Sequence, residues 1–302
     1  MKESQSAETP FVLNPKVSCV VVNWNGWQDT IECLSALKEC RYPSLTVIVI
    51  DNGSTNDSVA RIRSAHPDVL LLKSETNLGF AGGNNIGIRY ALAHGADYLW
   101  LLNNDTKPAP DALSALVGKV LNDKSIGAVS SVCYYADSPS TVQAWAGTRV
   151  NLWIGYVRNS LVPREDKWFQ ALYGASLLIA GAAIKDVGLL DEGFFLYWEE
   201  TEFCLRLRKK GWRLAAAPDS CVLHKANAST GGNKLILDRY FTASGLRILR
   251  LHSPAPLLAS LVFLTVRFGR RMLQFQFARC RSVWSGVRDY RRMFPASLGK
   301  LG

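Results

Sequence analysis

The sequence lacks several features that mark secreted or membrane-spanning proteins. Its seven cysteines form an odd set without a CxxC pair, and the apolar run 17–22 contains one of them, which favours reduced thiols over a disulfide framework. The polar segment 1–8 has no apolar stretch of the kind found in signal peptides. The apolar run 254–266 has 13 residues, fewer than the roughly 20 that a spanning helix needs. We therefore expect the active part of the chain to lie in the cytoplasm.

Acidic residues are almost absent from the C-terminal part of the chain. Residues 1–245 hold 24 Lys and Arg against 24 Asp and Glu, whereas residues 246–302 hold 11 against Asp289 alone. The net charge of +10 thus belongs to the tail. With 302 residues and 48% hydrophobic composition, the chain can bury a full core. We predict three parts, namely a flexible N-terminus over 1–15, a main domain over 16–245 and a basic amphipathic helical tail over 246–302.

Within the tail, large apolar residues step by four and three and predict one face of a helix. Arginines surround this stripe, as in helices that lie on anionic membranes. We expect the segment 254–295 to contact an anionic membrane surface; the alternative is that the stripe docks the helix onto the core. The stripe consists of Leu273, Phe277, Cys280, Trp284 and Val287.

Apolar runs rich in β-branched residues alternate with segments of helical length, which predicts an α/β fold with a mainly parallel sheet. From 134 to 170 the pattern changes to Ser, Pro, Gly and Trp and predicts loops. Regular structure is expected again at 173–179 as a strand, at 205–210 as a helix and at 212–223 as extended chain ending at His224. The four N-terminal strands are expected at 17–22, 45–50, 69–72 and 98–102.

Ligands bind such sheets at the carboxyl ends of the strands, so the residues after each run are candidates for a site. Asp51 can accept hydrogen bonds from a ligand or form a turn with Asn52. The glycine-rich segment 79–83 offers backbone N–H groups at a helix start, as phosphate binding requires, although glycine loops are weak evidence alone. Asp105 offers an oxygen ligand for Mg²⁺ or Mn²⁺, or caps a helix.

The segment 191–206 packs five acidic side chains among seven large apolar ones. The carboxylates of Glu199, Glu200 and Glu202 repel one another and resist burial, so at least one is expected to have an altered pKa or to face a cation, as a general base does. The alternative is a solvated helix start whose acids favour the helix dipole.

Taken in order, these motifs resemble the family 2 glycosyltransferases of the GT-A fold, and most closely the rhamnosyltransferase-like branch that builds bacterial surface polysaccharides. The resemblance covers about residues 16–245 and is specific for the family, though less so for the sugar. The matching segments are 21–25, 49–57, 77–85, 101–105 and 188–195 running into Glu199-Glu200.

The resemblance implies a role for individual residues. Asp51 holds the nucleotide base, and Asp105 binds the divalent metal, Mg²⁺ or Mn²⁺, with His224 completing the metal site. Glu200 is the general base and Glu199 a possible substitute. Two departures stand out, because Glu200 replaces the commoner aspartate and Asn103 replaces the first acid of the Asp-x-Asp motif. The donor-binding residues are Asn23, Asn25, Asp51, Asn77, Gly79, Gly82, Asn84, Asn103 and Asn104.

The activity that the resemblance implies is inverting transfer of L-rhamnose from dTDP-L-rhamnose to a lipid-linked glycan, by an enzyme on the inner face of the cell membrane. One alternative is a UDP-hexose donor such as UDP-galactose or UDP-glucose. A second is a catalytically silent nucleotide- or glycan-binding scaffold, because of the two departures. A third, nucleic-acid binding through the basic tail, is disfavoured because no known module is present and apolar residues separate the arginines.

Overall fold

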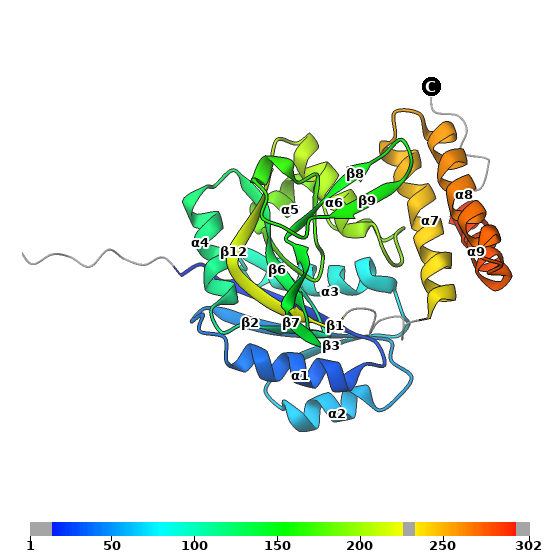
Figure 1. Cartoon of the computed structure of the whole chain (residues 1–302). Coiled ribbons are helices and arrows are strands. Elements are labelled where there is room, and N and C mark those ends of the chain that lie inside the picture. Colours follow the sequence, from blue (N-terminus) through cyan, green and yellow to red (C-terminus); the bar gives the residue numbers. More distant parts are fainter. Residues whose placement is uncertain (1–13, 226–232, 294–302) are drawn as a thin grey trace, which may run out of the picture.

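A computed structural model describes residues 14–225 and 233–293 (Figure 1). The N-terminal half of this region builds four parallel strands in the spatial order β3-β2-β1-β4, as the alternating pattern predicted. Helices of amphipathic sequence link successive strands and cover the sheet. The strands are β1 (Val17–Asn23), β2 (Leu45–Asn52), β3 (Leu70–Ser74) and β4 (Tyr98–Asn103), and the helices are α1 (Trp27–Lys38), α2 (Ser58–Ala65) and α3 (Gly79–Ala93).

The same sheet becomes mixed beyond β4. β11 (Ser176–Ala180) lies antiparallel between β4 and β6 (Ile126–Tyr135), and β12 (Arg213–His224) runs parallel to β6. The short β5 (Thr106–Pro108) pairs antiparallel with the end of β12, and β7 (Ser138–Trp145) pairs with β6. The remaining helices of this part are α4 (Ala112–Asn122), α5 (Gly181–Val187) and α6 (Glu199–Lys209).

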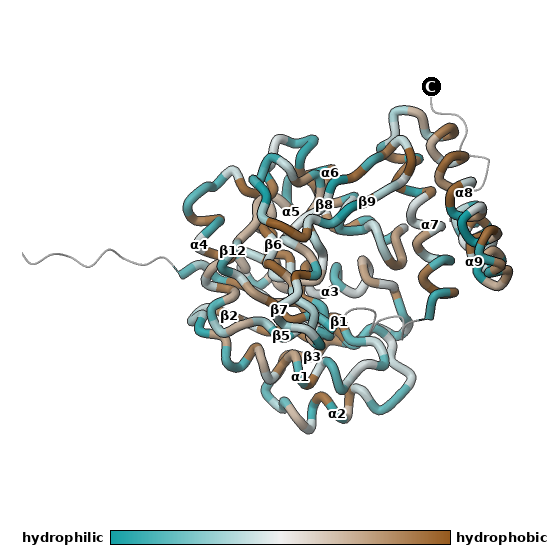
Figure 2. The backbone as a smooth tube through the Cα atoms, in the orientation of Figure 1, coloured by the Kyte–Doolittle hydropathy of each residue, from teal (hydrophilic) through white to brown (hydrophobic). Residues whose placement is uncertain are grey.

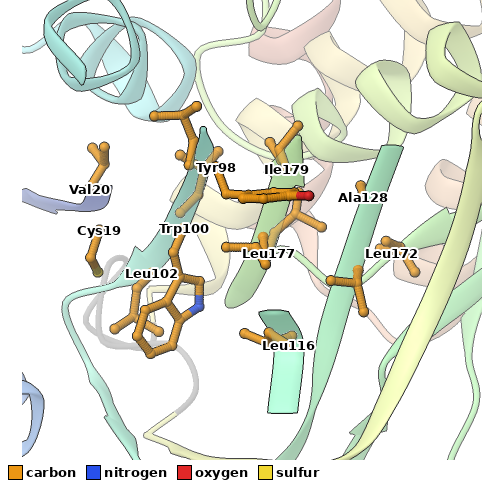
Figure 3. Close-up of a cluster of buried hydrophobic side chains, with 14 of the residues drawn as sticks. Cys19, Val20, Tyr98, Trp100, Leu102, Leu116, Ala128, Leu172, Leu177 and Ile179 are labelled. Carbon is orange, nitrogen blue, oxygen red and sulfur yellow. The ribbon is translucent and has the colours of Figure 1, made fainter. Parts of the chain in front are cut away.

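The core lies where the parallel and mixed halves of the sheet meet (Figure 3). Trp100 on β4 is fully buried, and its indole N–H donates to Ser176 Oγ on β11 at 2.9 Å. Leu177 and Ile179 of β11 pack in the same cluster. Burying such side chains contributes about 1.5–3 kcal/mol each, which holds the strand ends in a fixed relation.

The predicted loops at 134–170 are wrong, because most of this segment forms strands. After β7, the strands β8 (Gly147–Asn151), β9 (Tyr156–Asn159) and β10 (Ala171–Leu172) make a small second sheet in the order β10-β8-β9, and a 3-10 turn covers Asp166–Trp168. These strands are short, and β9 has no fully buried side chain. They consequently lack the apolar run from which the longer strands were predicted.

Three helices form the C-terminal part, namely α7 (Lys234–His252), α8 (Pro256–Leu273) and α9 (Phe277–Met293). They are joined through Asp238 of α7, whose buried carboxylate accepts hydrogen bonds from Arg267 and Arg271 of α8 and from Arg279 of α9. Burial opposes ionisation of Asp238, but the arginines outweigh it and lower its pKa. Some arginines of the tail therefore hold the three helices together.

The predicted apolar stripe does not lie on one helix. Leu273 ends α8 and Phe277 begins α9, with Phe275 between them in a left-handed conformation. Cys280 and Val287 are buried, whereas Trp284 is 48% exposed. A side chain at Gly286 would lie 2.3 Å from the backbone oxygen of Arg239, so α9 packs closely on α7. The alternative, in which the stripe docks the helix onto the rest of the protein, therefore holds for Cys280 and Val287.

In the described part of the chain, no helix is long and apolar enough to cross a membrane. The predicted boundary between 245 and 246 falls within α7. The proposed flexible N-terminus lies almost wholly outside the described residues, as do the last residues of the predicted membrane segment.

Candidate active site

Asp51 is fixed at the point where β1 and β2 end. Asn23 lies opposite Asp51 in the strand register, and its amide nitrogen donates to Asp51 Oδ1 at 2.9 Å. The backbone N–H of Ser54 donates to Asp51 Oδ2 at 3.3 Å. Asp51 is only 2% exposed, so it belongs to the floor of the sheet edge rather than to a solvated turn.

Asn25 joins the two loops that follow these strands. It adopts a left-handed conformation with φ 56°, which asparagine tolerates better than most residues. Its side-chain oxygen accepts from the backbone N–H groups of Thr55 at 2.8 Å and Asn56 at 3.2 Å. Asn25 thus shapes the rim of the site next to Asp51.

The glycine-rich start of α3 is occupied by contacts within the protein. Gly79 has φ 74°, and a Cβ there would lie 2.3 Å from the backbone oxygen of Phe195. The N–H of Gly79 donates to Asn77 Oδ1 at 2.8 Å, and the N–H of Phe80 donates to Phe195 O at 2.7 Å. The loop therefore seats the acidic segment against α3, and direct phosphate binding stays a prediction.

Two further predicted donor residues belong to the same helix. Gly82 has no room for a Cβ, which would lie 2.7 Å from Leu78 Cβ. Asn84 is buried and donates to the backbone oxygen of Phe80 at 2.9 Å. The structure thus gives both residues a role in packing the helix start.

The residues after β4 contact two different parts of the protein. Asn104 donates to Thr30 Oγ1 of α1 at 3.0 Å. Asn103 and Asp105 instead approach His224, although about 120 residues of chain intervene. The pairing of β5 with β12 places His224 opposite Thr106, directly after Asp105. The predicted pair Asp105 and His224 is therefore brought together by the sheet.

His224 is held in a defined orientation. Its Nδ1 lies 2.6 Å from Gln143 Oε1, which can only accept, so Nδ1 carries a proton, and in the neutral imidazole Nε2 then presents a lone pair. Nε2 lies 3.2 Å from Asp105 Oδ1, which has no hydrogen-bond partner among the described residues although it is buried. The side-chain oxygen of Asn103 is likewise buried and without a partner in this part of the chain.

These donors fit a divalent cation. A lone pair facing a carboxylate oxygen at 3.2 Å is unfavourable unless a proton or a cation relieves it, and O and N donors of this kind suit Mg²⁺ or Mn²⁺. Asp105 and His224 would hold such an ion, with Asn103 beside them. Across the described residues, no group of three His, Cys, Asp or Glu side chains gathers at one point, so the protein supplies few ligands.

Three of the five acids in the segment 191–206 have cationic partners. Asp191 pairs with Arg247, Glu192 with Arg89, and Glu202 with Arg206, while His252 Nε2 lies 3.2 Å from Glu202 Oε1. Such pairing removes the repulsion that the sequence suggested. Glu199 and Glu200 are different, since each has a buried Oε2 that lacks a hydrogen-bond partner within the described residues.

The backbone before Glu199 and Glu200 is strained. Tyr197 and Trp198 both adopt left-handed conformations, with φ 69° and 74°, which cost free energy for large residues. Beside the helix start, a Cβ on Gly174 would lie 3.0 Å from Glu200 Cγ, so glycine leaves room for this side chain. Packing thus forces two carboxyl groups into the interior at the first turn of α6.

Burial raises the pKa of both carboxyl groups. For Glu199, the charge of Glu200 adds to the effect of burial, and for Glu200 burial is the main cause. Burial also raises the pKa of Tyr173, to which the nearby charges of Asp105 and Glu200 contribute. Tyr173 therefore lies within electrostatic reach of both the Asp105 carboxylate and Glu200.

Sequence reasoning missed Gln143 and Tyr173. Both contact His224, with Tyr173 Oη 3.4 Å from Nδ1, yet Gln143 lies in the segment that was predicted to be loops. Neither position carries a motif, and only the pairing of β7 with β6 reveals that Gln143 faces the site.

The family model of "Glycosyl transferase family 2" matches residues 18–194. The chain belongs to glycosyl transferase family 2. The match includes the strand-end residues from Asn23 to Asp105 and ends within the acidic segment. It confirms the predicted family and the role of the chain as a glycosyltransferase.

Curated relatives include three transferases of different specificity. The chain is 25% identical to the low-salt glycan biosynthesis hexosyltransferase Agl10 of Haloferax volcanii, over 64% of this chain and 62% of that protein. It is 26% identical to the N-acetylglucosaminyl-diphospho-decaprenol L-rhamnosyltransferase of Mycobacterium tuberculosis, over 66% and 72%. It is 29% identical to the galactofuranosyltransferase GlfT1 of the same species, over 70% and 71%.

Solved glycosyltransferase structures share the fold. A mannosyltransferase of Pyrobaculum calidifontis, PcManGT, solved in complex with GDP-Man and Mn²⁺, superposes with a TM-score of 0.59 at 18% identity, covering 96% of this chain and 77% of that one. The family and this likeness confirm the GT-A fold with helices flanking a mixed sheet and a C-terminal helical part.

Glu200→Gln is expected to stabilise this glycosyltransferase above acidic pH. A carboxyl group whose pKa is raised on folding costs stability as pH rises above its unfolded pKa of about 4.3. Removing the charge should therefore raise the free energy of unfolding at pH 8 by on the order of 1 kcal/mol, with little change at pH 4. Urea unfolding at both pH values measures this.

Glu192→Gln provides the matched control. Hydrogen bonds from Asn85 and Arg89 lower the pKa of Glu192, so its loss should reduce stability at pH 8 rather than increase it. Equal effects of the two substitutions at both pH values would contradict the assignment of a buried, unpaired charge to Glu200.

Proposed function

We propose that this protein transfers L-rhamnose from dTDP-L-rhamnose to a hydroxyl group of a lipid-linked glycan, with inversion at the anomeric carbon. The observation that carries the proposal is the adjacent carboxyl groups of Glu199 and Glu200, each with a buried Oε2 that has no hydrogen-bond partner among the described residues, in a site to which we also assign Asp105 and His224. The likeness to an N-acetylglucosaminyl-diphospho-decaprenol L-rhamnosyltransferase supports the choice of sugar and of acceptor class.

Glu200 is the proposed general base. Its raised pKa makes it a stronger proton acceptor than an exposed glutamate, and its carboxylate would take the proton of the acceptor hydroxyl as the oxygen attacks the anomeric carbon. The bond from that carbon to the diphosphate breaks in the same step. A divalent ion bound by Asp105 and His224 would supply charge neutralisation for the departing diphosphate. Asp51 would hold the base of the nucleotide.

Glu200→Gln should lower turnover by about two to four orders of magnitude while donor binding persists, since general-base assistance is lost but the nucleotide site is intact. Turnover with dTDP-L-rhamnose and calorimetric donor affinity measure the two effects. Glu199→Gln is the matched control and should retain most activity. A near-normal rate in Glu200→Gln, together with an inactive Glu199→Gln, would transfer the role to Glu199.

The donor can be identified by thermal stabilisation with nucleotides and nucleotide sugars, since ligands that bind only the folded state raise its melting temperature. We expect a larger, Mn²⁺-dependent shift with dTDP and dTDP-L-rhamnose than with UDP species. Asp105→Ala should abolish the Mn²⁺-dependent part, because it removes one of the two proposed protein ligands. An unchanged shift in Asp105→Ala would count against the metal site.

A UDP-hexose donor is the second candidate, because the galactofuranosyltransferase GlfT1 is as similar to this chain as the rhamnosyltransferase is. A larger rise in melting temperature with UDP species than with dTDP species would establish a UDP-hexose donor. The absence of a shift with every nucleotide would favour a silent scaffold.

We further propose that the protein works at the inner face of the cell membrane, with its C-terminal helices against anionic lipid. The outer side of α8 exposes Leu257 by 89%, Leu258 by 55% and Leu261 by 63%, and Figure 2 shows this helix as a largely hydrophobic segment. Exposed arginines occur nearby on α8 and α9, as in interfacial helices. The exposed apolar surface is thus mainly that of α8.

Leu257→Gln/Leu261→Gln should reduce binding to phosphatidylglycerol vesicles by at least about tenfold, because each buried leucine contributes about 1.5–3 kcal/mol. Flotation of the full chain with vesicles measures this, with phosphatidylcholine vesicles as the charge control. Equal flotation of variant and parent would show that α8 does not insert.

A further inference from the structure

A second group of charged and aromatic side chains that could bind a ligand lies outside the proposed catalytic centre, on the hairpin formed by β8 and β9. The tip of this hairpin rests on the C-terminal helices, since a Cβ at Gly155 would lie 2.6 Å from the ring of Phe263 and 3.2 Å from Leu249 (Figure 1). Gly155 has φ 61°, so glycine permits both the turn and the close approach. The hairpin therefore bridges the catalytic domain and the apolar helix α8.

Two arginines face each other across this hairpin. Arg149 of β8 is directly opposite Arg158 of β9 in the antiparallel register, and both are exposed. Like charges in directly opposed positions destabilise a sheet. No ion pair among the described residues engages Arg149, Arg158 or the nearby Arg164. The arrangement thus leaves a concentration of positive charge that the protein itself does not neutralise.

An indole ring orders these cations. The guanidinium group of Arg149 lies 5.7 Å from the ring centre of Trp168, and that of Arg164 lies 5.4 Å from the same ring. Such stacking fixes a guanidinium plane while leaving its N–H groups available for an anion. Gln170 is fixed as well, since its Oε1 accepts from the backbone N–H of Val150 at 2.7 Å.

These side chains line a pocket of about 580 Å³, a size that fits a small ligand. Arg149, Arg158, Trp168 and Gln170 form its polar part, and Trp153 and Tyr156 add aromatic surface. Arginine forks match the oxygens of phosphate groups, and aromatic faces pack against apolar groups or sugar rings. The chemistry of the lining therefore suits a phosphate-bearing ligand that also has an apolar or glycan part.

The lining of the pocket is connected along the chain both to the region of Glu200 and to the apolar surface of α8. From Gln170 in its lining, the chain continues for four residues to Gly174, which contacts Glu200, so the two Cα atoms are at most about 14 Å apart. On the other side, Pro254 lines the pocket and is followed by the exposed Leu257. A ligand with its phosphates here could reach the base with a short glycan and the membrane with its lipid.

We propose that this pocket binds the diphosphate group of the lipid-linked acceptor. The proposal rests on the proposed function for the identity of the acceptor, but the pocket and its charge do not depend on which sugar is transferred. The donor diphosphate belongs to the separate site at Asp105 and His224. The acceptor would thus be held in one position, with its phosphates at the hairpin and its reacting hydroxyl group at Glu200.

Farnesyl diphosphate, a lipid diphosphate without sugar, is the probe for this pocket. Its binding to the full chain is measured by calorimetry in EDTA, so that divalent ions cannot attract it to the donor site. We expect Arg149→Gln/Arg158→Gln to raise its dissociation constant at least about tenfold. The matched control Arg63→Gln/Lys124→Gln removes two exposed charges elsewhere and should leave the dissociation constant within about twofold. Equal affinity in the parent and in Arg149→Gln/Arg158→Gln would overturn the proposal.

Two comparisons separate the sources of phosphate. Inorganic pyrophosphate should bind more weakly than farnesyl diphosphate, and equal affinities would overturn the assignment to a lipid-bound diphosphate. Binding of phosphatidylglycerol vesicles should be reduced less than farnesyl diphosphate binding in the arginine variant. A loss confined to vesicles would instead show a site for anionic headgroups.

Two further measurements distinguish a loss of ligand binding from a loss of folding, namely the melting temperature and the affinity of a lysine variant. The melting temperature of Arg149→Gln/Arg158→Gln should not fall, because opposed like charges are removed, and Arg149→Lys/Arg158→Lys should recover part of the affinity. A lower melting temperature with no recovery by lysine would indicate a structural role and overturn the proposal. Farnesyl diphosphate contains neither sugar nor nucleotide, so its binding does not depend on the proposed reaction. If no nucleotide stabilised the protein, the proposed transfer of rhamnose would be contradicted, but the binding of farnesyl diphosphate to the pocket would be unaffected.

Discussion

The site depends on one pairing at the edge of the main sheet, that of the short β5 with the end of β12. This pairing brings His224 next to Asp105 and thereby closes a distance of about 120 residues along the chain. β6 supports β12 from the other side and carries β7, from which Gln143 orients the imidazole ring. If β5 were displaced by one residue, the side chains would exchange faces and the pair would separate.

The second constraint is the burial of charge at the start of α6. Arginines neutralise Asp191, Glu192 and Glu202, and the pairs of Glu192 with Arg89 and of Asp191 with Arg247 tie the acidic segment to α3 and α7. Glu199 and Glu200 receive no such compensation, and the backbone before them is held in a strained conformation. Strain and buried charge without a cationic partner both cost stability, and they occur together at the carboxyl group that we propose as the general base.

The C-terminal helices combine structural and surface roles. Asp238 gathers three arginines, of which Arg271 and Arg279 were predicted to surround a membrane-facing stripe, while other arginines remain exposed. The apolar exposure lies on α8, beside the hairpin whose opposed arginines line a pocket. Pro254, two residues before the start of α8, lines that pocket, so the pocket and the apolar surface of α8 adjoin along the chain.

The sequence by itself determined the α/β pattern, the family and the strand-end residues, because buried parallel strands have unmistakable apolar runs. Asn23 and Asp51 directly follow such runs, and Asp105 is the third residue after the run 98–102. It did not reveal β7 to β9, since these half-exposed strands lack such runs, and it left open whether Cys280 and Val287 face a membrane or the core. Only the tertiary structure decided which acids are paired, that Gln143 orients His224 and that Arg149 faces Arg158. These relations join residues distant in the chain, and no local pattern encodes a contact that arises only when strands and helices pack together.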